Sequence, residues 1–545
     1  MISASTTGTF TQVIIIGAGM SGLAMACQLK KQLFCEDFVI YDRAPSFGGT
    51  WYFKKYPGCG VDIPAAFYSF SFALYPQFTC FFPKQEEILQ YIHGVADDFS
   101  VARKLVGHTE WEGADWQDSE QCWEVRLREI PSGRKFTRRC RILISAVGGL
   151  TNPKHIMLQG IERFQGNIVH TARWDQETSV AGKNVIVIGN GASATQFIPA
   201  IADDAASINQ FIRTPHHYMP GKNFRINGLW SAIFQSIPVC FWLFRAFIFL
   251  YLETSILLGE LTWMGKLMRR WETYRSRQHV RKCAPEEQYW SLLTPEYSIG
   301  CKRRVFDNDG YLKCLHRPNV DITNDPVVAV EEQSITTQSG KRFPADLIVF
   351  ATGFSLSQYD VDRRGRNGRT RQEHWNRFGC IQAFETVAMA EFPNFLYILG
   401  PNSGRGHTST VYSIESHVDL VIRIIKPIME RNALSVVIKQ ASEERVNAKL
   451  KSALRKTVFT NMCRSWYIDP RTDQNWFTYP WNSFRMWYTT QYGGTEDWTY
   501  TKAVASLDNQ SRPCSCRCGR EALPILIIIL CLLFICIFAT EHGMR

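Results

Sequence analysis

Two glycine-rich turns, each between a short apolar run and a helix-like stretch, constrain the fold of this chain more than any other feature. The first turn follows a β-branched run at residues 13–16 and leads into an apolar-periodic stretch at residues 23–29. Its glycines are Gly17, Gly19 and Gly22. This order predicts a strand, a tight turn and a helix whose N-terminus can hold a pyrophosphate.

An acidic residue stands where such a unit needs one. Residues 38–41 read as the next strand, and Asp42 follows them, 20 residues beyond Gly22. A carboxylate at this place would accept a hydrogen bond from a ribose hydroxyl. A glycine turn alone is weak evidence, but within this βαβ pattern it predicts a dinucleotide site.

The pattern repeats in the middle of the chain with a different ending. Residues 185–188 form the apolar run before the second turn, and residues 208–212 read as the strand that follows. The turn contributes Gly189, Gly191 and Ser193. Arg213 and Thr214 stand where the first unit has its carboxylate, and an arginine there can pair with the 2′-phosphate of NADP. Two dinucleotides are therefore expected, the second one phosphorylated.

Two later strand ends also deliver glycines to a ligand edge. Residues 347–350 run into Thr352 and Gly353, and residues 395–399 run into Gly400. We therefore expect the first domain to resume after the NADP unit. Residues 466–498, which are rich in Trp and Tyr, are expected to form a lid or a pocket wall.

Length and composition describe a globular protein of more than one domain. The 545 residues exceed one ordinary core, and 45% are hydrophobic against 20% charged. The net charge of +11 suits an anionic cofactor or an acidic membrane surface. No nucleic-acid module is recognisable in the sequence, so nucleic acid is not an expected partner.

An uncharged segment near the C-terminus predicts a membrane anchor. Residues 523–539 read LPILIIILCLLFICIFA, which at about 1.5 Å per residue roughly spans a thin bilayer core. The alternative is a buried core helix, but such helices are usually shorter and amphipathic. Arg512, Arg517 and Arg520 precede the segment, so the positive-inside tendency places the main body in the cytosol. We expect a single-pass anchor at residues 523–540 and no secretory signal in residues 1–12.

Residues 226–298 form a second region of unusual composition. Residues 237–252 are aromatic and apolar but include Arg245, and residues 269–282 are strongly basic. The alternatives are a membrane span and a packed helical subdomain. The charge of Arg245 and the short apolar runs beside it favour a helical insert.

A motif between the two glycine turns resembles the fingerprint of Baeyer–Villiger monooxygenases, FxGxxxHxxxW(P/D). The matching residues are Phe164, Gly166, His170, Trp174 and Asp175. Other flavin-containing monooxygenases are similar but usually lack the final Trp-Asp or Trp-Pro. The motif stands just before the NADP turn, as in that family, and the resemblance covers roughly residues 11–492.

Four further stretches look like segments of the same family. The residues that match the segment under the flavin ring are Gly49, Thr50, Trp51 and Asp62. The residues that match the NADP-phosphate segment are Arg213 and Thr214, and those that match the hinge between domains are Thr352 and Gly353. The segment with the active-site arginine corresponds to Lys302 and Arg303. The family commonly has a paired tyrosine after this arginine, whereas this chain has Gly310-Tyr311-Leu312, which leaves the substrate's shape open.

The resemblance implies an FAD- and NADPH-dependent monooxygenase that inserts one oxygen atom of O₂ into a lipophilic ketone. The product would be an ester or a lactone, and the setting secondary metabolism. Arg303 would be the catalytic cation, Asp62 would hold and tune it, and Lys302 and Arg213 would clamp the 2′-phosphate. The structural alternatives are a surface ion pair for Arg303 and a capped turn for Asp62.

Other functions stay open on the sequence. Heteroatom oxidation, hydroxylation or epoxidation would use the same fold and cofactors. A flavin disulfide reductase would need a cysteine pair near the first glycine-rich segment, and residues 51–62 contain only Cys59. A non-catalytic membrane scaffold would not need intact glycines at both turns.

These expectations define an α/β fold with two Rossmann-type dinucleotide-binding domains, a helical insert and a C-terminal transmembrane helix. The FAD-binding domain is expected at residues 1–155 and, with a C-terminal lid, at residues 341–510. The NADP-binding domain is expected at residues 156–225 and 299–340. The insert occupies residues 226–298 and the anchor residues 523–540.

Overall fold

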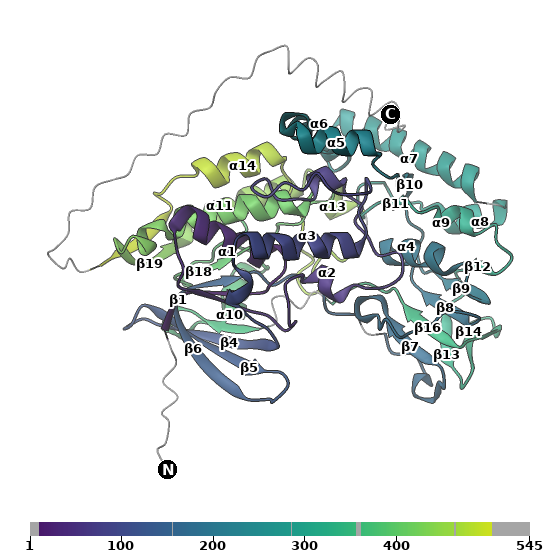
Figure 1. The fold of residues 1–545 in the computed structure, drawn as a ribbon, viewed down its shortest axis with the longest axis horizontal. Coiled ribbons are helices and arrows are strands. Elements are labelled where there is room, and N and C mark those ends of the chain that lie inside the picture. Colours follow the sequence, from purple (N-terminus) through teal and green to yellow (C-terminus); the bar gives the residue numbers. More distant parts are fainter. Residues whose placement is uncertain (1–9, 155, 285, 356–360, 463–464, 504–545) are drawn as a thin grey trace.

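The computed structural model describes residues 10–503 except 155, 285, 356–360 and 463–464. Two sheets stand side by side with helices packed over them (Figure 1). The anchor expected at residues 523–540 lies outside the described residues.

The larger sheet has the strand order β17-β4-β5-β6-β1-β2-β3, with β18 also paired to β6. Its strands are β1 (Phe10–Ile16), β2 (Phe38–Tyr41), β3 (Leu105–Val106), β4 (Thr109–Gln117), β5 (Cys122–Glu129), β6 (Lys135–Ser145), β17 (Asp362–Arg364) and β18 (Phe395–Tyr397). β1 pairs in parallel with β2 and β6, whereas β4, β5 and β6 are antiparallel. Both faces of β1 are buried because Val13 and Ile15 pack among the helices and Ile14 packs against β4 and β5.

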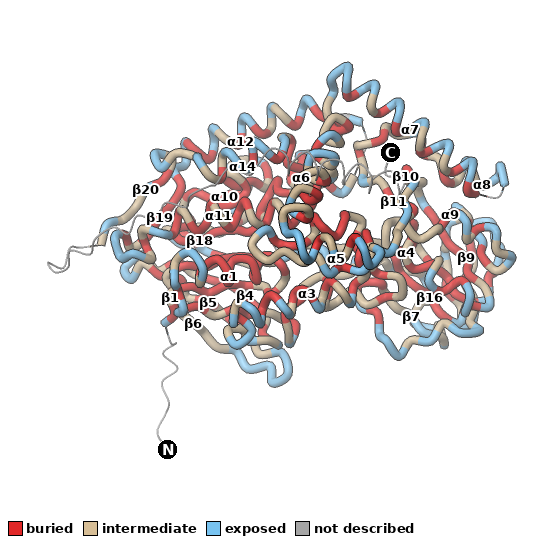
Figure 2. Tube along the Cα trace, turned by 45° about the horizontal axis from the view of Figure 1, so that its top comes forward, coloured by how far each residue is buried: buried red, intermediate tan, exposed pale blue. Residues whose placement is uncertain are grey.

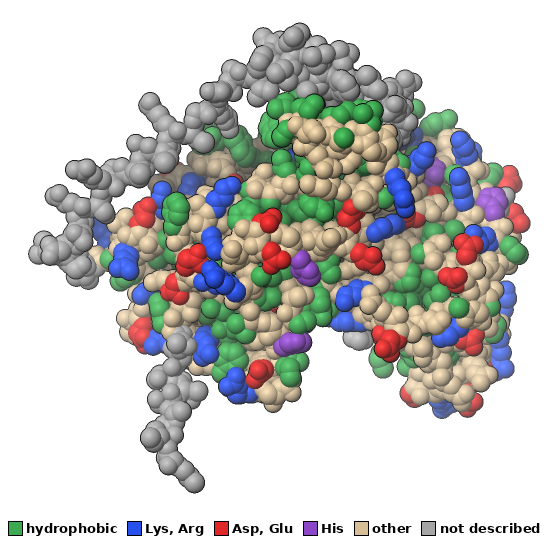
Figure 3. Space-filling model, viewed as in Figure 1, with side chains coloured by type: hydrophobic (Ala, Val, Ile, Leu, Met, Phe, Trp, Pro, Cys, Tyr) green, Lys and Arg blue, Asp and Glu red, His purple; other side chains and the backbone are tan. Residues whose placement is uncertain are grey.

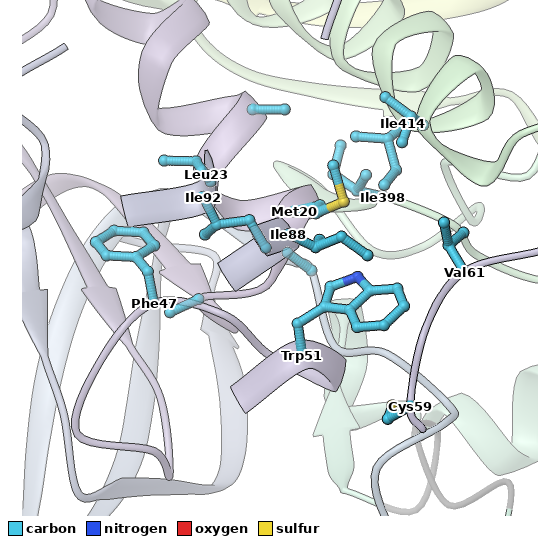
Figure 4. Close-up of a cluster of buried hydrophobic side chains, with 14 of the residues drawn as sticks. Met20, Leu23, Phe47, Trp51, Cys59, Val61, Ile88, Ile92, Ile398 and Ile414 are labelled. Carbon is cyan, nitrogen blue, oxygen red and sulfur yellow. The ribbon is translucent and has the colours of Figure 1, made fainter. Parts of the chain in front are cut away.

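Three helices cover the parallel part of this sheet: α1 (Met20–Leu33), α3 (Gln85–Asp98) and α11 (Thr410–Met429). In Figure 4, Met20 and Leu23 of α1 lie beside Ile88 and Ile92 of α3, with Ile414 of α11 on the other side. Buried residues run through all of these elements (Figure 2). This packing holds α1 in place directly after the first glycine turn.

The second sheet is parallel throughout and has the order β12-β9-β8-β16-β7. Its strands are β7 (Asn167–His170), β8 (Asn184–Ile188), β9 (Ser207–Phe211), β12 (Val320–Thr323) and β16 (Leu347–Phe350). α4 (Ala192–Ile201) follows the second glycine turn, and a small antiparallel sheet packs beside it, formed by β13 (Val327–Val330), β14 (Ser334–Thr337) and β15 (Arg342–Pro344). This part is the second dinucleotide-binding unit.

One expected domain boundary is wrong. Residues 341–510 were expected to rejoin the first unit, but β16 pairs with β8 on one side and β7 on the other, inside the second sheet. The return to the first sheet occurs later, at β17 and β18. A four-residue apolar strand reads the same for either parallel sheet, so the sequence did not reveal which strands it would join.

The region expected as a helical insert folds into α5 (Gly228–Ser236), α6 (Pro238–Thr254), the 3₁₀ turn η5 (Ser255–Leu258), α7 (Trp263–Cys283) and α8 (Glu287–Leu293). Within the described residues, the helical stretch Pro238–Leu258 is long and apolar enough to cross a membrane. One face of it nevertheless packs on the body: Phe241, Phe244 and Ile248 are buried, and Arg245 donates to the carbonyl oxygens of Ala66 and Ser69 at 2.7 and 2.8 Å.

The remaining elements connect or cover the two sheets. The helices are α2 (Thr50–Phe53), α9 (Tyr311–Cys314), α10 (Arg371–Phe378), α12 (Gln440–Leu454), α13 (Val458–Asn461) and α14 (Ser483–Tyr492). The 3₁₀ turns are η1 (Ala65–Phe67), η2 (Ala102–Lys104), η3 (Ile161–Arg163), η4 (Thr171–Arg173) and η6 (Arg366–Gly368). The strands are β10 (Tyr218–Pro220), β11 (Val305–Asp307), β19 (Ala433–Ile438) and β20 (Trp498–Lys502).

Candidate active site

The first glycine turn lies at the carboxyl end of β1. Gly17 donates its N–H to the carbonyl oxygen of Tyr41 at 2.8 Å, and α1 begins at Met20 with Gly19 as its N-cap. Gly22 packs in the first turn of α1 directly against the carbonyl of Gly17. The N-terminal amides of α1 therefore face a surface without side chains, which fits a dinucleotide pyrophosphate.

The segment around Gly49 packs onto this turn. Gly49 has φ +53, and a Cβ at this position would lie 2.7 Å from the Cα of Gly19. Only glycine fits both the left-handed backbone and this close approach. The contact places Thr50 and Trp51 of α2 beside the turn, and the Trp51 indole N–H donates to the hydroxyl of Tyr68 at 3.1 Å.

Asp42 lies at the same turn. Its carboxylate accepts the backbone N–H groups of Ala18 at 2.6 Å and Ala44 at 2.7 Å. Burial raises the pKa of Asp42, and these hydrogen bonds oppose that effect. The residue therefore fixes the loop that leaves β1, and its contact with a ribose stays a prediction.

The second glycine turn has the same form. Gly189 has φ +121, and a Cβ there would collide with the carbonyl oxygen of Ala351. Gly191 caps α4, and nothing lies within 4 Å of the side-chain position that it leaves open. Ser193, in the first turn of α4, interacts with the hydroxyl of Tyr56.

A buried chain of hydrogen bonds supports the second turn from behind, and the sequence did not predict it. The hydroxyl of Tyr311 donates to Gln210 Oε1 at 2.5 Å, and Gln210 Nε2 donates to the carbonyl oxygen of Gly189 at 2.8 Å. Tyr311 also stacks on Tyr218 with ring centroids 5.4 Å apart. The single tyrosine of the Gly310-Tyr311-Leu312 segment is thus a structural residue of the NADP-binding unit.

Two cations belong to the second unit: Arg213 follows β9, and Lys302 precedes β11. Arg213 is exposed, and Lys302 is half-buried with its ammonium 4.5 Å from the ring centroid of Tyr297. Partial burial and the nearby charge of Arg213 both lower the pKa of Lys302. The structure therefore brings these two residues together, and an anionic group between them would relieve their repulsion. Thr214 accepts from Asn190 Nδ2 through its carbonyl oxygen at 2.8 Å.

Arg303 and Asp62 form an ion pair across the two units. Nη2 of Arg303 lies 2.6 and 2.5 Å from the two carboxylate oxygens of Asp62. The Arg303 side chain is 54% exposed, and the charge of Asp62 raises its pKa. The segment that holds Asp62 is itself fixed on α4, because the Tyr56 hydroxyl donates to Gln196 Oε1 at 2.8 Å and Gln196 Nε2 donates to the carbonyl oxygen of Gly60 at 3.0 Å.

Lys54 is a further cation beside this pair, and the sequence did not predict its role. The ammonium of Lys54 lies 4.2 Å from the ring centroid of Phe354 and interacts with the charges of Arg303 and Asp62. Burial lowers its pKa to about 8. Its position in the Trp51–Asp62 stretch was the available signal, but lysine is common on surfaces and the sequence does not say which way it points.

A small cavity of about 40 Å³ opens beside Arg303. Its walls come from η5, from residues 300–304 and from the segments around His407, Tyr467 and Tyr479, so the Trp- and Tyr-rich region does contribute a pocket wall.

His407 lies 3.5 Å from Glu253. Burial raises the pKa of Glu253, but hydrogen bonds from His407 and Ser483 outweigh this effect and lower the pKa to about 2. Among the residues that the structure describes, no group of three His, Cys, Asp or Glu could hold a metal ion.

The expected hinge lies where the units meet. The Thr352 hydroxyl is 3.3 Å from Nε2 of His170 and 3.2 Å from the carbonyl oxygen of Lys154. Nδ1 of His170 accepts the N–H of Ala172 at 2.9 Å, and Gly353 has φ +85. His170 of the fingerprint motif thus joins two backbone segments, which is a structural role.

Comparison with known proteins agrees with this geometry. The model of the NAD(P)-binding Rossmann-like domain family matches residues 15–82. A Baeyer-Villiger monooxygenase of Pseudomonas aeruginosa is 32% identical over 508 residues, which cover 92% of this chain and 94% of that protein. The FAD-binding monooxygenase ktnD of Aspergillus niger is 30% identical over 488 residues, which cover 87% of this chain and 79% of that protein.

A solved structure supports the same fold. An oxidised steroid monooxygenase bound to NADP superposes with a TM-score of 0.79 at 24% identity, covering 91% of this chain and 100% of that one. At this identity the likeness concerns the fold alone. The extent of the match to the Pseudomonas relative decides the family, and the chain belongs to the Baeyer–Villiger monooxygenases.

Proposed function

We propose that this chain uses FAD and NADPH to insert one atom of O₂ between the carbonyl carbon of a lipophilic ketone and its neighbour. NADPH supplies two electrons, the second oxygen atom leaves as water, and the product is an ester or a lactone. The observation that carries this proposal is the ion pair of Arg303 and Asp62, with Arg303 at the edge of a cavity. Such a cation suits a reaction in which negative charge develops on a carbonyl oxygen.

The two cofactors fit different parts of the chain. The cradle of Gly17, Gly19 and Gly49 beside Trp51 suits FAD, and the turn at Gly189 and Gly191 suits NADPH. We assign residues 341–353 to the NADPH unit because β16 belongs to its sheet. Arg213 and Lys302 would hold the 2′-phosphate, which they can do as two cations placed near each other.

Bound FAD, once reduced, supplies the activation of O₂. The protein's part is electrostatic: Arg303 would stabilise the charge on the ketone oxygen, and Asp62 would fix the guanidinium's orientation. Thr352 and Gly353 would let the units move as the cofactors bind and leave. The aromatic walls at Tyr467 and Tyr479 would exclude water and accept an apolar substrate.

We also propose that the protein is membrane-bound through a C-terminal anchor at residues 523–540, with its body in the cytosol. The uncharged run and the arginines that precede it support this proposal. A membrane location would suit a substrate that partitions into lipid.

Product analysis tests the proposed reaction. Purified protein with FAD and NADPH should be yellow, oxidise NADPH and convert a cyclic ketone into the lactone with one ¹⁸O atom from ¹⁸O₂. A thioether offered in parallel is the control substrate. Sulfoxide formation without any lactone from a panel of ketones would move heteroatom oxidation ahead of the ketone reaction.

A further inference from the structure

α7 has its apolar side turned outward. Trp263, Leu267, Trp271 and Tyr274 follow the three- and four-residue spacing of one helix face, and their side chains are 76, 62, 56 and 54% exposed. A helix on the surface of a globular protein normally buries such a stripe. An exposed stripe of this size marks an interaction surface.

The opposite face of α7 packs on the protein: it is mostly polar along the first part of the helix and apolar near the end, at Val280 and Cys283. Gly265, Arg269, Glu272 and Ser276 are buried there. Arg269 donates to the carbonyl oxygens of Leu258 and Glu260. The hydrogen bonds of Arg269 and the core contacts of Val280 and Cys283 therefore hold α7 with its aromatic face outside.

Neighbouring helices extend this apolar surface. Trp242, Leu250 and Tyr251 of α6 are exposed, as are Phe484 and Tyr488 of α14. α6 and α14 touch through Phe249 and Phe484, whose ring centroids are 5.3 Å apart, and η5 connects α6 to α7. All three helices lie on the same side of the molecule (Figures 1 and 2), and hydrophobic side chains gather over α5 and α6 (Figure 3).

Basic residues flank the aromatic stripe. α7 contains seven Lys and Arg residues against one acidic residue, Glu272, which is buried. Lys266, Arg270 and Arg277 are exposed on the side next to Trp263 and Tyr274. Trp and Tyr at the boundary of lipid and water, with cations beside them, are the chemistry of a helix that lies in the interface of an anionic bilayer.

We propose that the exposed faces of α6, α7 and α14 form a docking surface for the interfacial region of an anionic phospholipid bilayer. The surface lies on the bilayer and does not cross it, because α6 is held to the body by Phe241, Phe244 and the hydrogen-bonded Arg245. The uncharged run at residues 523–539 is an independent feature of the sequence that fits the same bilayer.

The segment between α6 and α7 lines the cavity beside Arg303. Ser255, Ile256 and Leu258 of η5 line that cavity, and η5 joins the two helices whose outer faces carry the surface. Only the next step rests on the proposed function: an apolar ketone dissolved in the bilayer would enter the protein next to α6 and α7. The docking itself does not depend on catalysis.

Photo-crosslinking tests the surface in the full-length protein. p-Benzoylphenylalanine is placed at Trp271, or at Met157 as the control, which is 89% exposed and lies outside this surface. Each protein is irradiated with vesicles of phosphatidylcholine and phosphatidylserine in a 4:1 ratio, and the adducts are identified by mass spectrometry. We expect phospholipid adducts at position 271 at least about tenfold above those at position 157.

Two outcomes would overturn the proposal. Equal lipid adducts at both positions would mean that contact is unspecific, and adducts at position 271 to the C-terminal segment or to a second copy of the chain would assign the face to a protein surface.

Reversing charge by Lys266→Glu with Arg270→Glu should lower the lipid adducts at position 271 several-fold. Arg134→Glu with Lys135→Glu, on exposed residues at the start of β6 and just before it, is the matched control and should leave them unchanged. An undiminished yield in the first double variant would remove the electrostatic part of the proposal.

Discussion

Nη2 of Arg303 lies 2.6 and 2.5 Å from the two carboxylate oxygens of Asp62, a residue 241 positions earlier in the chain. Asp62 stands in a segment fixed on α4, and Arg303 follows the helical insert. The cation is therefore positioned by contacts from both dinucleotide-binding units. A guanidinium is protonated at ordinary pH, and Asp62 raises the pKa of Arg303 further, so this side chain acts as a permanent cation.

Gly49→Ala should impair FAD binding. The alanine would need φ +53 and would place its Cβ 2.7 Å from the backbone of Gly19, so the segment would have to move off the first turn. We expect FAD affinity to fall at least about tenfold, since a shift of about 1.4 kcal/mol suffices for that loss. Gly94→Ala is the control: its site in α3 is open, so FAD content should stay normal. Normal FAD content in both variants would argue against the proposed cradle.

Arg213→Ala should separate the two nicotinamide cofactors. A hydrogen bond between charged groups contributes about 1.5–3 kcal/mol, so KM for NADPH should rise roughly 10- to 100-fold. KM for NADH should change little because NADH has no 2′-phosphate. Steady-state kinetics with both cofactors measure this, with Arg163→Ala, an exposed arginine of the same unit, as the control. Equal losses with NADPH and NADH would remove Arg213 from the phosphate site.

The expected pH dependence rests on Lys54. Its pKa of about 8 means that it is charged below pH 8 and loses its charge as the pH rises through that value. The positive charge beside Arg303 should favour the reaction, so the rate of ketone conversion should fall with an apparent pKa near 8. Lys54→Met should abolish this inflection. Lys55→Met, whose ammonium lies instead 4.7 Å from the ring centroid of Tyr52, should retain it; an inflection that survives in Lys54→Met would assign it to another group.

Truncation after Arg520 should release a soluble and active enzyme. The residues of the proposed site all precede residue 504, so the last segment should set location and leave the chemistry unchanged. FAD content and kcat should match those of the full-length protein in detergent. Loss of FAD on truncation would indicate that residues 521–545 pack on the catalytic body.

The sequence predicted the local units well because their signals are local. β2 and β16 have the predicted bounds, since both are buried apolar runs that end at turn residues. Both glycine turns precede helices, as expected. The two glycine turns and the resemblance to the family indicated the cofactors, and a further stretch that resembles the family indicated the segment of Arg303.

The features that the sequence did not predict depend on which distant segments come together in the fold. The sheet to which β16 belongs was predicted wrongly because its four apolar residues fit either sheet. Lys54 and Tyr311 acquire their roles only through Phe354 and Gln210, which lie far from them in the chain. The outward face of α7 was hidden for the same reason, since its basic and aromatic residues show no sign of which side packs on the body.

The most direct test of the account is the fate of reducing equivalents in Arg303→Ala. The variant should bind FAD, and NADPH should still reduce it, because neither step needs the cation that faces the ketone. Ester formation should fall by at least about 10²–10³, the usual cost of removing one charge-stabilising donor, and hydrogen peroxide should appear in its place. Arg303→Lys should restore little, since a point charge cannot keep the planar geometry of the pair with Asp62. Ester formation by Arg303→Ala at nearly the wild-type rate would contradict the proposed role of Arg303.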